Sequence, residues 1–357
     1  MVLASKEINQ DLNINDNCFD IIRIVAAYTV FLGHFITHFN VPFPVLFDIA
    51  YFVRGVPVFF LLSGFFIAAS LERYTAKEFL IRRFVRIYPA MWICILLNTL
   101  IIFCIYALPP IKDLFVYFFT QFTVFQFYTG DWLRGYGVGN PNGALWMISC
   151  MIQFYIIAIF IAKWMKSRSL KTWISVIILF AMVSLISAKL QGLFPEIIWK
   201  LYAVEIIPFL YIFMFGMAMY YHRHRMIPVL KRYWYLFCVI YIAWEIFVPS
   251  SVKAVFDGVL YNVVTTVFLS LMIGAIGFAF GRHRLKADYS YSFYLYHMVV
   301  INIIYHLFIQ RITSVFSLLG ILSLSTVLVV LLAVLSQKLI EQKTGNLLQK
   351  QLLKRFC

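Results

Sequence analysis

Ten long apolar runs constrain the fold of this 357-residue chain more than any other feature. The hydrocarbon core of a bilayer is crossed by about 20 apolar residues of helix, and inside it only helices and closed barrels satisfy every backbone hydrogen bond. The runs cover approximately residues 20–38, 51–70, 87–108, 145–162, 172–188, 205–221, 234–249, 259–281, 290–309 and 316–337. With 63% hydrophobic and 13% charged residues, a soluble multidomain protein is excluded. The sequence predicts an all-α fold, a polytopic membrane helix bundle of about ten transmembrane helices forming one domain over residues 1–357.

The distribution of Lys and Arg predicts the side of the membrane on which each loop lies. If a further apolar run at 113–127 stays on the outer side without crossing, 23 of the 30 basic residues fall on one face. Seven remain for the other face: Arg54, Lys112, Arg134, Lys189, Lys200, Lys253 and Arg311. Cytoplasmic loops carry such an excess, so both termini are predicted to be cytoplasmic, with a polar N-terminus over 1–18 and a basic tail over 338–357. The net charge of +15 is thus a topology signal, and no nucleic-acid partner is expected.

The cysteines indicate neither disulfides nor a metal site. The six are Cys18, Cys94, Cys104, Cys150, Cys238 and Cys357. None of them forms a CxxC pair, four lie in apolar runs and two lie near the chain ends. Zinc sites and disulfide frameworks show closer and more regular spacing. We therefore expect no bound metal.

The first apolar run carries four ionisable side chains, Asp20, Arg23, His34 and His38. Arg23 and His34 are eleven residues apart. That spacing is three helical turns plus about 20°, so both side chains share one helix face, roughly 16 Å apart along the axis. Ionisable residues within a membrane helix are costly and mark candidate functional sites. The alternative is that Arg23 anchors the topology and that His34 is a hydrogen-bonded packing residue.

A second polar cluster lies in FLIRRFVRIYPAMW, residues 79–92, at the cytoplasmic start of a membrane run. Arg83 and Arg86 lie about one helical turn apart, with Arg82 alongside. Guanidinium groups bind phosphate bidentately, so the cluster is a candidate site for a polyanion such as the phosphates of an acyl-CoA. The alternative is an anchor bound to lipid headgroups, and the cluster alone leaves both interpretations open.

Three further stretches complete a set of five motifs. They are RGVPVFFLLSGFFI at 54–67, NGALWMISCMIQFY at 142–155 and YSYSFYLYH at 289–297. With the Asp-x-x-Arg…His spacing of the first run and the Arg-x-x-Arg cluster, they follow one another over roughly residues 19–300. In these motifs, their order and the predicted ten-helix topology, the chain resembles the acyltransferase 3 family. Members of that family are integral membrane enzymes that O-acylate surface carbohydrates and related acceptors.

The resemblance implies an O-acyltransferase that uses acyl-CoA. The acyl group, acetyl by default, would pass from the cytosol across the membrane to a hydroxyl of a cell-surface carbohydrate such as lipid-linked O-antigen or another polysaccharide. Acetyl-CoA would be a co-substrate, with no permanently bound cofactor. The implied location is the bacterial cytoplasmic (inner) membrane, as a multi-pass protein. The implied partners are acyl-CoA, a lipid-linked or surface glycan and membrane lipids.

The resemblance also implies roles for the two polar clusters. His34 is expected to be the general base that deprotonates the acceptor hydroxyl, since histidine titrates near neutrality. Arg83 and Arg86, with Arg82 beside them, are expected to hold the donor phosphates. Arg23 is expected to guide the pantetheine arm.

The remaining motifs contribute supporting residues. These are Ser63, Trp146, Gln153, Tyr155, Tyr294 and His297. Tyr294 and His297 would orient the thioester or donate to the oxyanion, and their alternative role is hydrogen bonding between helices. Ser63 is either a covalent acyl carrier or, with the glycine that follows it, a helix-packing device.

The chain departs from the family at one position. Many members have a Glu-Glu pair before Gln-Phe-Tyr, where this chain has Met151 and Ile152. A role for those carboxylates therefore does not carry over. Asp131, Glu196 and Glu205 are the acidic residues on the predicted outer side that are candidates to replace them.

Two other classes of function compete with acyl transfer. A transporter or flippase for a lipid-linked saccharide would use the buried charges to line a path. Inverted-repeat transporters show paired short or broken helices in matching halves, and the sequence shows no such pairs. An accessory subunit of a polysaccharide machine is the third class, and it would tolerate the loss of His34.

Overall fold

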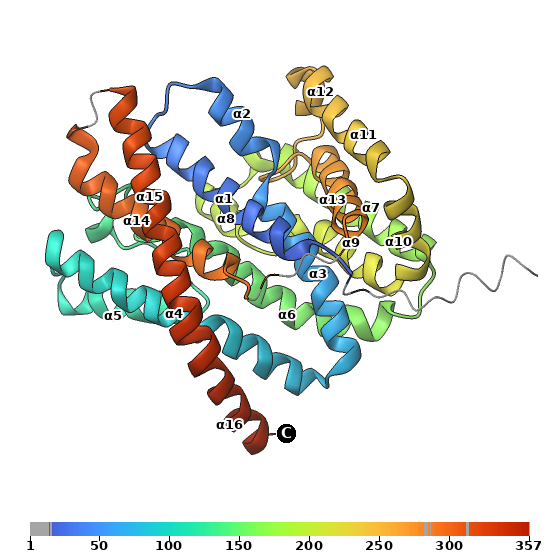
Figure 1. Ribbon diagram of the computed structural model, residues 1–357, viewed down its shortest axis with the longest axis horizontal. Coiled ribbons are helices and arrows are strands. Elements are labelled where there is room, and N and C mark those ends of the chain that lie inside the picture. Colours follow the sequence, from blue (N-terminus) through green and yellow to red (C-terminus); the bar gives the residue numbers. More distant parts are fainter. Residues whose placement is uncertain (1–13, 15, 282–284, 286, 312–313, 357) are drawn as a thin grey trace, which may run out of the picture.

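The computed structural model describes residues 14, 16–281, 285, 287–311 and 314–356 (Figure 1). These residues form helices joined by turns, with one isolated β-bridge between Asp257 and Asn262. The predicted all-α polytopic bundle is confirmed. Three basic residues assigned to a cytoplasmic loop, Arg282, Arg284 and Lys286, lie outside the described residues, as do most residues of the N-terminal segment.

The helices follow the apolar runs closely. The α-helices are α1 Phe19–His38, α2 Pro44–Phe52, α3 Gly55–Arg73, α4 Ala76–Ile105, α5 Ile111–Phe122, α6 Trp146–Met165, α7 Leu170–Lys189, α8 Glu196–Ala203, α9 Leu210–Tyr221, α10 Arg223–Arg232, α11 Trp234–Phe247, α12 Ser250–Ala254, α13 Val263–Ala279, α14 Ser290–Phe308, α15 Val315–Ser336 and α16 Asn346–Phe356. A π-helix, η7 Gln337–Gly345, joins α15 to α16. Each of the ten predicted runs corresponds to one helix or to one pair of consecutive helices.

Length and composition allow six of the described helices to cross a membrane, or up to eight if each bent pair is one span. The other two predicted runs are α13, an apolar helix of 17 residues, and α14, which has 19 residues. The count of ten crossings therefore stays a prediction. Helix α5 has 12 residues, which at 1.5 Å per residue is about 18 Å. It is too short to cross alone, in keeping with the interfacial placement of the run at 113–127.

Two spans are bent, which the sequence did not indicate. The α8 segment meets the helix over 207–221 at 48°, and α10 meets α11 at 73°. The two bent pairs follow one another directly in the chain. They therefore do not occupy the matching positions in two halves that an inverted-repeat transporter would show.

Helices α3 and α9 pack with their backbones in close contact near the centre of the bundle. A Cβ atom on Gly64 would lie 2.0 Å from the carbonyl oxygen of Phe213, and one on Gly216 would lie 2.0 Å from that of Leu61. Small residues allow such an approach between membrane helices. The Ser63-Gly64 pair thus has a packing role through its glycine.

We expect Gly64→Ala to destabilise the bundle, because the added methyl group meets backbone atoms that cannot move independently. Overpacking typically costs about 1–3 kcal/mol and occasionally more. Gly320→Ala in α15 is the matched control, since a Cβ there would meet nothing within 4 Å. Thermal unfolding in detergent should show a lower transition temperature for Gly64→Ala alone. Equal transitions for the two variants would contradict the close packing of α3 and α9.

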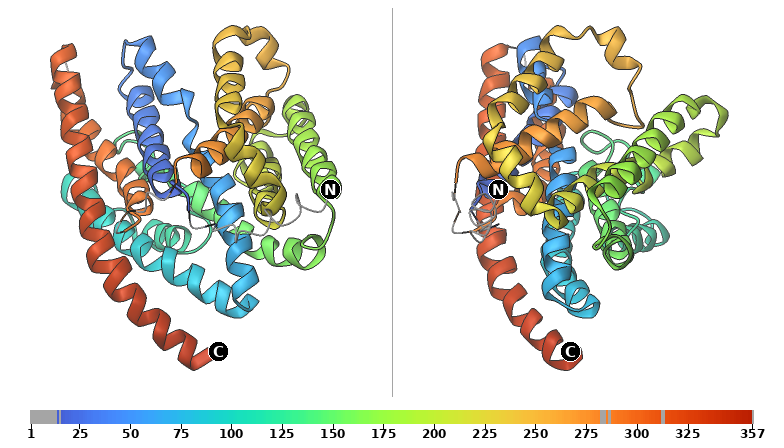
Figure 2. Two further views of the ribbon diagram at one scale, coloured as in Figure 1. Left: turned by 45° about the vertical axis from the view of Figure 1, so that its right-hand side comes forward. Right: turned by 90° about the vertical axis from the view of Figure 1, so that its right-hand side faces the viewer.

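The C-terminal end of the chain forms one long helix. Residues 315–356 are helical throughout, so the predicted basic tail continues the last apolar run as η7 and α16. In Figure 2 this helix runs along one edge of the bundle and extends past the other helices to the C-terminus. Both η7 and α16 pack against α4. The C-terminal segment therefore lies beside the helix that carries the three arginines.

Candidate active site

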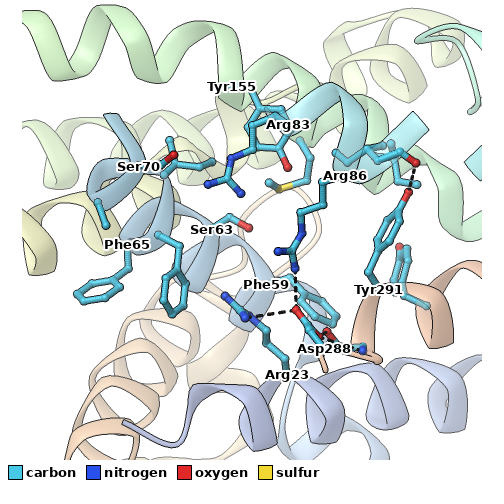
Figure 3. Close-up of a pocket in the computed structure, with 18 of the residues that line it drawn as sticks. Arg23, Phe59, Ser63, Phe65, Ser70, Arg83, Arg86, Tyr155, Asp288 and Tyr291 are labelled. Atoms are coloured by element: carbon cyan, nitrogen blue, oxygen red, sulfur yellow. Dashed lines mark hydrogen bonds and ion pairs between the residues drawn. The ribbon is translucent and has the colours of Figure 1, made fainter. Parts of the chain in front are cut away.

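A pocket of about 380 Å³ lies among α1, α3, α4, α6 and the start of α14 (Figure 3). Its polar lining residues are Arg23, Ser63, Ser70, Arg73, Tyr74, Arg83, Arg86, Tyr155, Asp288, Ser290, Tyr291 and Tyr294. Figure 3 shows the arginines of α1 and α4 pointing into one space from different helices. The structure thus brings together residues from all five of the predicted motifs. We call this space the arginine pocket.

Asp288 joins two of these arginines. Its Oδ2 atom lies 2.7 Å from Arg86 Nη2 and 3.4 Å from Arg23 Nη1. Its Oδ1 atom accepts hydrogen bonds from the backbone N–H of Ser290 at 3.1 Å and from the Ser290 hydroxyl at 2.5 Å. Burial raises the pKa of Asp288, but Arg23 and Arg86 outweigh it and lower that pKa to about 2. The carboxylate therefore stays charged at physiological pH and ties α1, α4 and the start of α14 together.

Asp288 is not among the site residues predicted from the sequence. The residue directly precedes the motif YSYSFYLYH at 289–297. It is also an acidic residue within a loop that the charge pattern assigns to the basic cytoplasmic face. A lone acid directly before a predicted motif, in a loop that also contains Arg282, Arg284 and Lys286, is the sequence signal that would have identified it.

We expect Asp288→Ala to lower stability by about 1–3 kcal/mol. Removing one partner of a fully buried pair costs about 3–5 kcal/mol, and the estimate is reduced because the Arg86 side chain is 47% exposed. Glu196→Ala is the control, because it breaks the exposed pair with Lys200, and such pairs contribute little. Thermal unfolding of both variants measures the difference. If Asp288→Ala lowered the transition temperature no more than Glu196→Ala does, the Asp288 carboxylate would not hold the helices together.

Arg83 differs from Arg86 in having no carboxylate partner among the described residues. Its guanidinium carbon lies 5.3 Å from the ring centroid of Phe79 and 5.8 Å from that of Tyr155. The Nε atom is buried and has no hydrogen-bond partner in the described part of the chain. Arg83 is therefore a cation in the pocket that is available to an anionic ligand.

The predicted catalytic histidine lies in a row of three imidazole rings. The ring centroid of His34 is 5.8 Å from that of His38 and 5.4 Å from that of His297. Arg23 pairs with Asp288, just before α14, and His34 lies beside His297 of α14. The shared helix face inferred from their spacing thus faces α14.

His297 is fully buried and held in one orientation. Its Nδ1 atom lies 2.6 Å from the carbonyl oxygen of Tyr294. A carbonyl only accepts, so Nδ1 carries the proton and Nε2 keeps a lone pair. That Nε2 atom has no partner among the described residues. His297 therefore places an acceptor nitrogen in the group of histidines around His34.

Tyr294 connects this group to the arginine pocket. Its side chain lines the pocket, and its carbonyl oxygen bonds His297. Its hydroxyl donates to the carbonyl oxygen of Ala144 at 2.6 Å. This hydrogen bond joins two segments of the bundle, in line with the alternative role of Tyr294 as a residue that links helices. His34 itself is not among the residues that line the pocket.

The other supporting residues divide into two groups. Ser63 and Tyr155 line the arginine pocket. Trp146 packs outside it, with ring centroids 5.8 Å from Phe209. Gln153 is half-buried and does not line the pocket.

Arg82 does not line the arginine pocket, and its guanidinium carbon lies 3.9 Å from the centroid of the Tyr74 ring. It lines a neighbouring pocket between α4 and the C-terminal helix, described below.

The position of the missing Glu-Glu pair lies at this site. Met151 lines the arginine pocket, and Ile152 does not. Of the three candidate replacements, Asp131 and Glu196 are exposed, and Glu205 is half-buried. None of the three is among the residues that line the pocket, so no described carboxylate from the outer side takes that place.

Fold and site together define a multi-pass membrane protein with a cation-lined pocket next to a buried histidine group. Residues 16–336 match the family model described as "Acyltransferase domain", and the chain belongs to this acyltransferase family. The resemblance drawn from the five motifs is confirmed.

Three relatives illustrate the family. "Nodulation protein 10" of Rhizobium leguminosarum bv. viciae is 26% identical over 323 residues, covering 80% of this chain and 83% of that protein. The "O-acetyl transferase" of Shigella phage Sf6 is 27% identical over 346 residues, covering 92% and 95%. "Peptidoglycan O-acetyltransferase OatA" of Listeria monocytogenes serovar 1/2a is 29% identical over 133 residues, covering 32% and 21%. No solved structure matches the chain.

Proposed function

We propose that this protein transfers an acyl group, acetyl by default, from cytoplasmic acyl-CoA to a hydroxyl of a cell-surface carbohydrate. The observation that carries the proposal is the link from the arginine pocket through Tyr294 to His297 and His34. Family membership supports acyl transfer. Two relatives named as O-acetyl transferases, one of them acting on peptidoglycan by its name, support acetyl as the group and a glycan as the acceptor.

The arginine pocket suits the donor. Its volume of about 380 Å³ lies within the range of ligand pockets, about 300–1,000 Å³. Arg83 has no carboxylate partner among the described residues, while Arg86 and Arg23 are oriented by Asp288. Arginines of this kind bind phosphate oxygens bidentately. The phosphates of acyl-CoA would lie at Arg83 and Arg86, with the pantetheine arm leading past Arg23 towards Tyr294.

The histidine group suits the acceptor. His34 would remove the proton of the acceptor hydroxyl as its oxygen attacks the thioester carbonyl carbon. The carbon–sulfur bond then breaks, the ester forms, and the CoA sulfur leaves and recovers a proton. His297, with its Nε2 lone pair beside His34, would orient the His34 ring and stabilise its protonated form. General-base catalysis of this type contributes about 10²–10⁴-fold in rate.

The charge distribution supports the proposed location and direction. The arginine pocket carries the basic residues of the face assigned to the cytoplasm, where acyl-CoA is made. A nucleotide does not cross hydrocarbon, whereas the acyl group can pass along the pocket to an acceptor on the outer side. We place the protein in the bacterial inner membrane, with a lipid-linked or surface glycan as its acceptor.

The test compares the surface glycans of cells with and without this protein by mass spectrometry and NMR. The proposal predicts one additional ester-linked acyl group on a defined sugar hydroxyl, removed by mild base. Identical glycans with and without the protein, at confirmed expression, would contradict it.

A further inference from the structure

A second pocket, of about 400 Å³, lies between α4 and the C-terminal helix. It adjoins the arginine pocket, because five residues line both: Ser70, Tyr74, Arg83, Arg86 and Asp288. Its remaining lining residues are Arg82, Val85, Gln337, Glu341, Gln342, Gly345, Asn346 and Gln349. The two pockets thus meet at Arg83 and Arg86, and an extended ligand bound at these guanidiniums has space on both sides.

The two walls of this second pocket differ in chemistry. The wall from α4 supplies three guanidinium groups, and the wall from η7 and α16 supplies four side-chain amides. These four amides, Gln337, Gln342, Asn346 and Gln349, are called the amide wall. The amide wall lies beyond residue 336, where the match to the family model ends. The wall is therefore a feature of this chain that the family assignment does not explain.

Several polar atoms in these walls are buried without a partner. Gln337 is 6% exposed, and its Oε1 atom accepts no hydrogen bond from the described residues. The Nε atoms of Arg82 and Arg83 are buried and equally unpartnered in the same part of the chain. By contrast, the Glu341 carboxylate is occupied, since it accepts a hydrogen bond from the Ser292 hydroxyl. Buried polar groups are nearly always paired, so these atoms are free to form hydrogen bonds with a polar ligand in the pocket.

We propose that the second pocket binds the adenosine phosphate half of acyl-CoA, with the phosphates at Arg82, Arg83 and Arg86 and the adenine against the amide wall. Asn and Gln amides pair bidentately with the N6 and N7 edge of adenine, and arginines bind phosphates in the same way. The acyl arm then enters the arginine pocket, where Tyr294 leads to the histidines. This inference rests on the proposed function and assigns a residue set to the nucleotide.

The test uses the full-length protein in detergent and three probes. These are acetyl-CoA, adenosine 3′,5′-bisphosphate, and acetyl-4′-phosphopantetheine, which lacks the adenosine. In the variant Gln342→Ala/Asn346→Ala/Gln349→Ala, binding of the first two probes should weaken about tenfold, as expected for the loss of one or two hydrogen bonds. Binding of acetyl-4′-phosphopantetheine should be unchanged. Gln351→Ala, an amide on the same helix that does not line the pocket, should leave all three probes unaffected.

The outcomes separate this inference from the proposed function. Wild-type protein that binds no acetyl-CoA would overturn both. Normal acetyl-CoA binding by the triple variant, or an equal loss for all three probes, would overturn only the nucleotide site. Displacement of adenosine 3′,5′-bisphosphate by anionic lipid vesicles as readily as by CoA would show a headgroup site and would also overturn it. Should the triple variant fail to fold, photo-crosslinking of wild-type protein with 8-azidoadenine-labelled CoA decides: labelling within residues 337–349 supports the site, and labelling elsewhere overturns it.

Discussion

Replacing His34 by alanine is expected to reduce acceptor acylation about 10²–10⁴-fold, the usual contribution of a general base. Acyl-CoA binding and thermal stability should stay near those of the wild type, because His34 does not line the arginine pocket. Its ring lies 5.4 Å from that of His297, between His38 and α14. The measurement is acylation of the acceptor beside acyl-CoA binding in the same purified preparation.

His38→Ala is the matched control for this prediction. His38 lies one turn from His34 on the same helix, and the two rings are stacked with centroids 5.8 Å apart. It has no described ring contact with His297, so its loss should reduce acylation far less. Near wild-type acylation by His34→Ala, or equal losses in the two variants, would remove the role assigned to His34.

Replacing Arg83 by alanine should produce the largest loss of donor affinity among the single arginine variants. Charge-assisted hydrogen bonds to phosphate contribute about 1.5–3 kcal/mol, which corresponds to roughly 10- to 150-fold in the dissociation constant. Arg86 is already paired with Asp288 at 2.7 Å, so we expect a smaller loss for Arg86→Ala. Lysine at position 83 should restore binding only in part, because it lacks the bidentate geometry.

Arg168→Ala is the control for Arg83→Ala. Arg168 lies in another of the predicted cytoplasmic basic loops and lines neither of the two arginine-lined pockets. Acetyl-CoA binding to the wild type, to Arg83→Ala and to Arg168→Ala is compared by calorimetry or equilibrium dialysis. If Arg83→Ala bound acetyl-CoA as tightly as Arg168→Ala, Arg83 would be an anchor for membrane topology and not a donor ligand.

The sequence predicted the helices and several of the residues that line the pocket, because both depend on local patterns. Apolar length placed all ten runs on helices, and an 11-residue spacing placed Arg23 and His34 on the face that meets α14. The basic cluster at 82–86 could be recognised because its members are neighbours in the chain. Motif resemblance supplied Ser63, Tyr155 and Tyr294 as residues near the pocket.

The contacts that complete the site were not predictable, since they join residues distant in the sequence. Arg23 and Asp288 are 265 residues apart, and His297 reaches His34 only through the packing of α14 on α1. Periodicity defines the face of each helix but not its partner. The π-helix after Ser336 and the two bent spans also depend on tertiary packing, which no local pattern in the chain specifies.

Turnover of acetyl-CoA by the purified protein in detergent, with a lipid-linked glycan present, tests the central claim most directly. Detergent removes the sealed bilayer, so transport between two compartments cannot occur in this assay, whereas acyl transfer can. Acyl transfer predicts that free CoA thiol appears in equal amount with ester-linked acetyl on the glycan, and that His34→Ala lowers the rate of both about 10²–10⁴-fold. A contradicting result would be no CoA release in detergent from protein that still moves the lipid-linked saccharide across sealed vesicles.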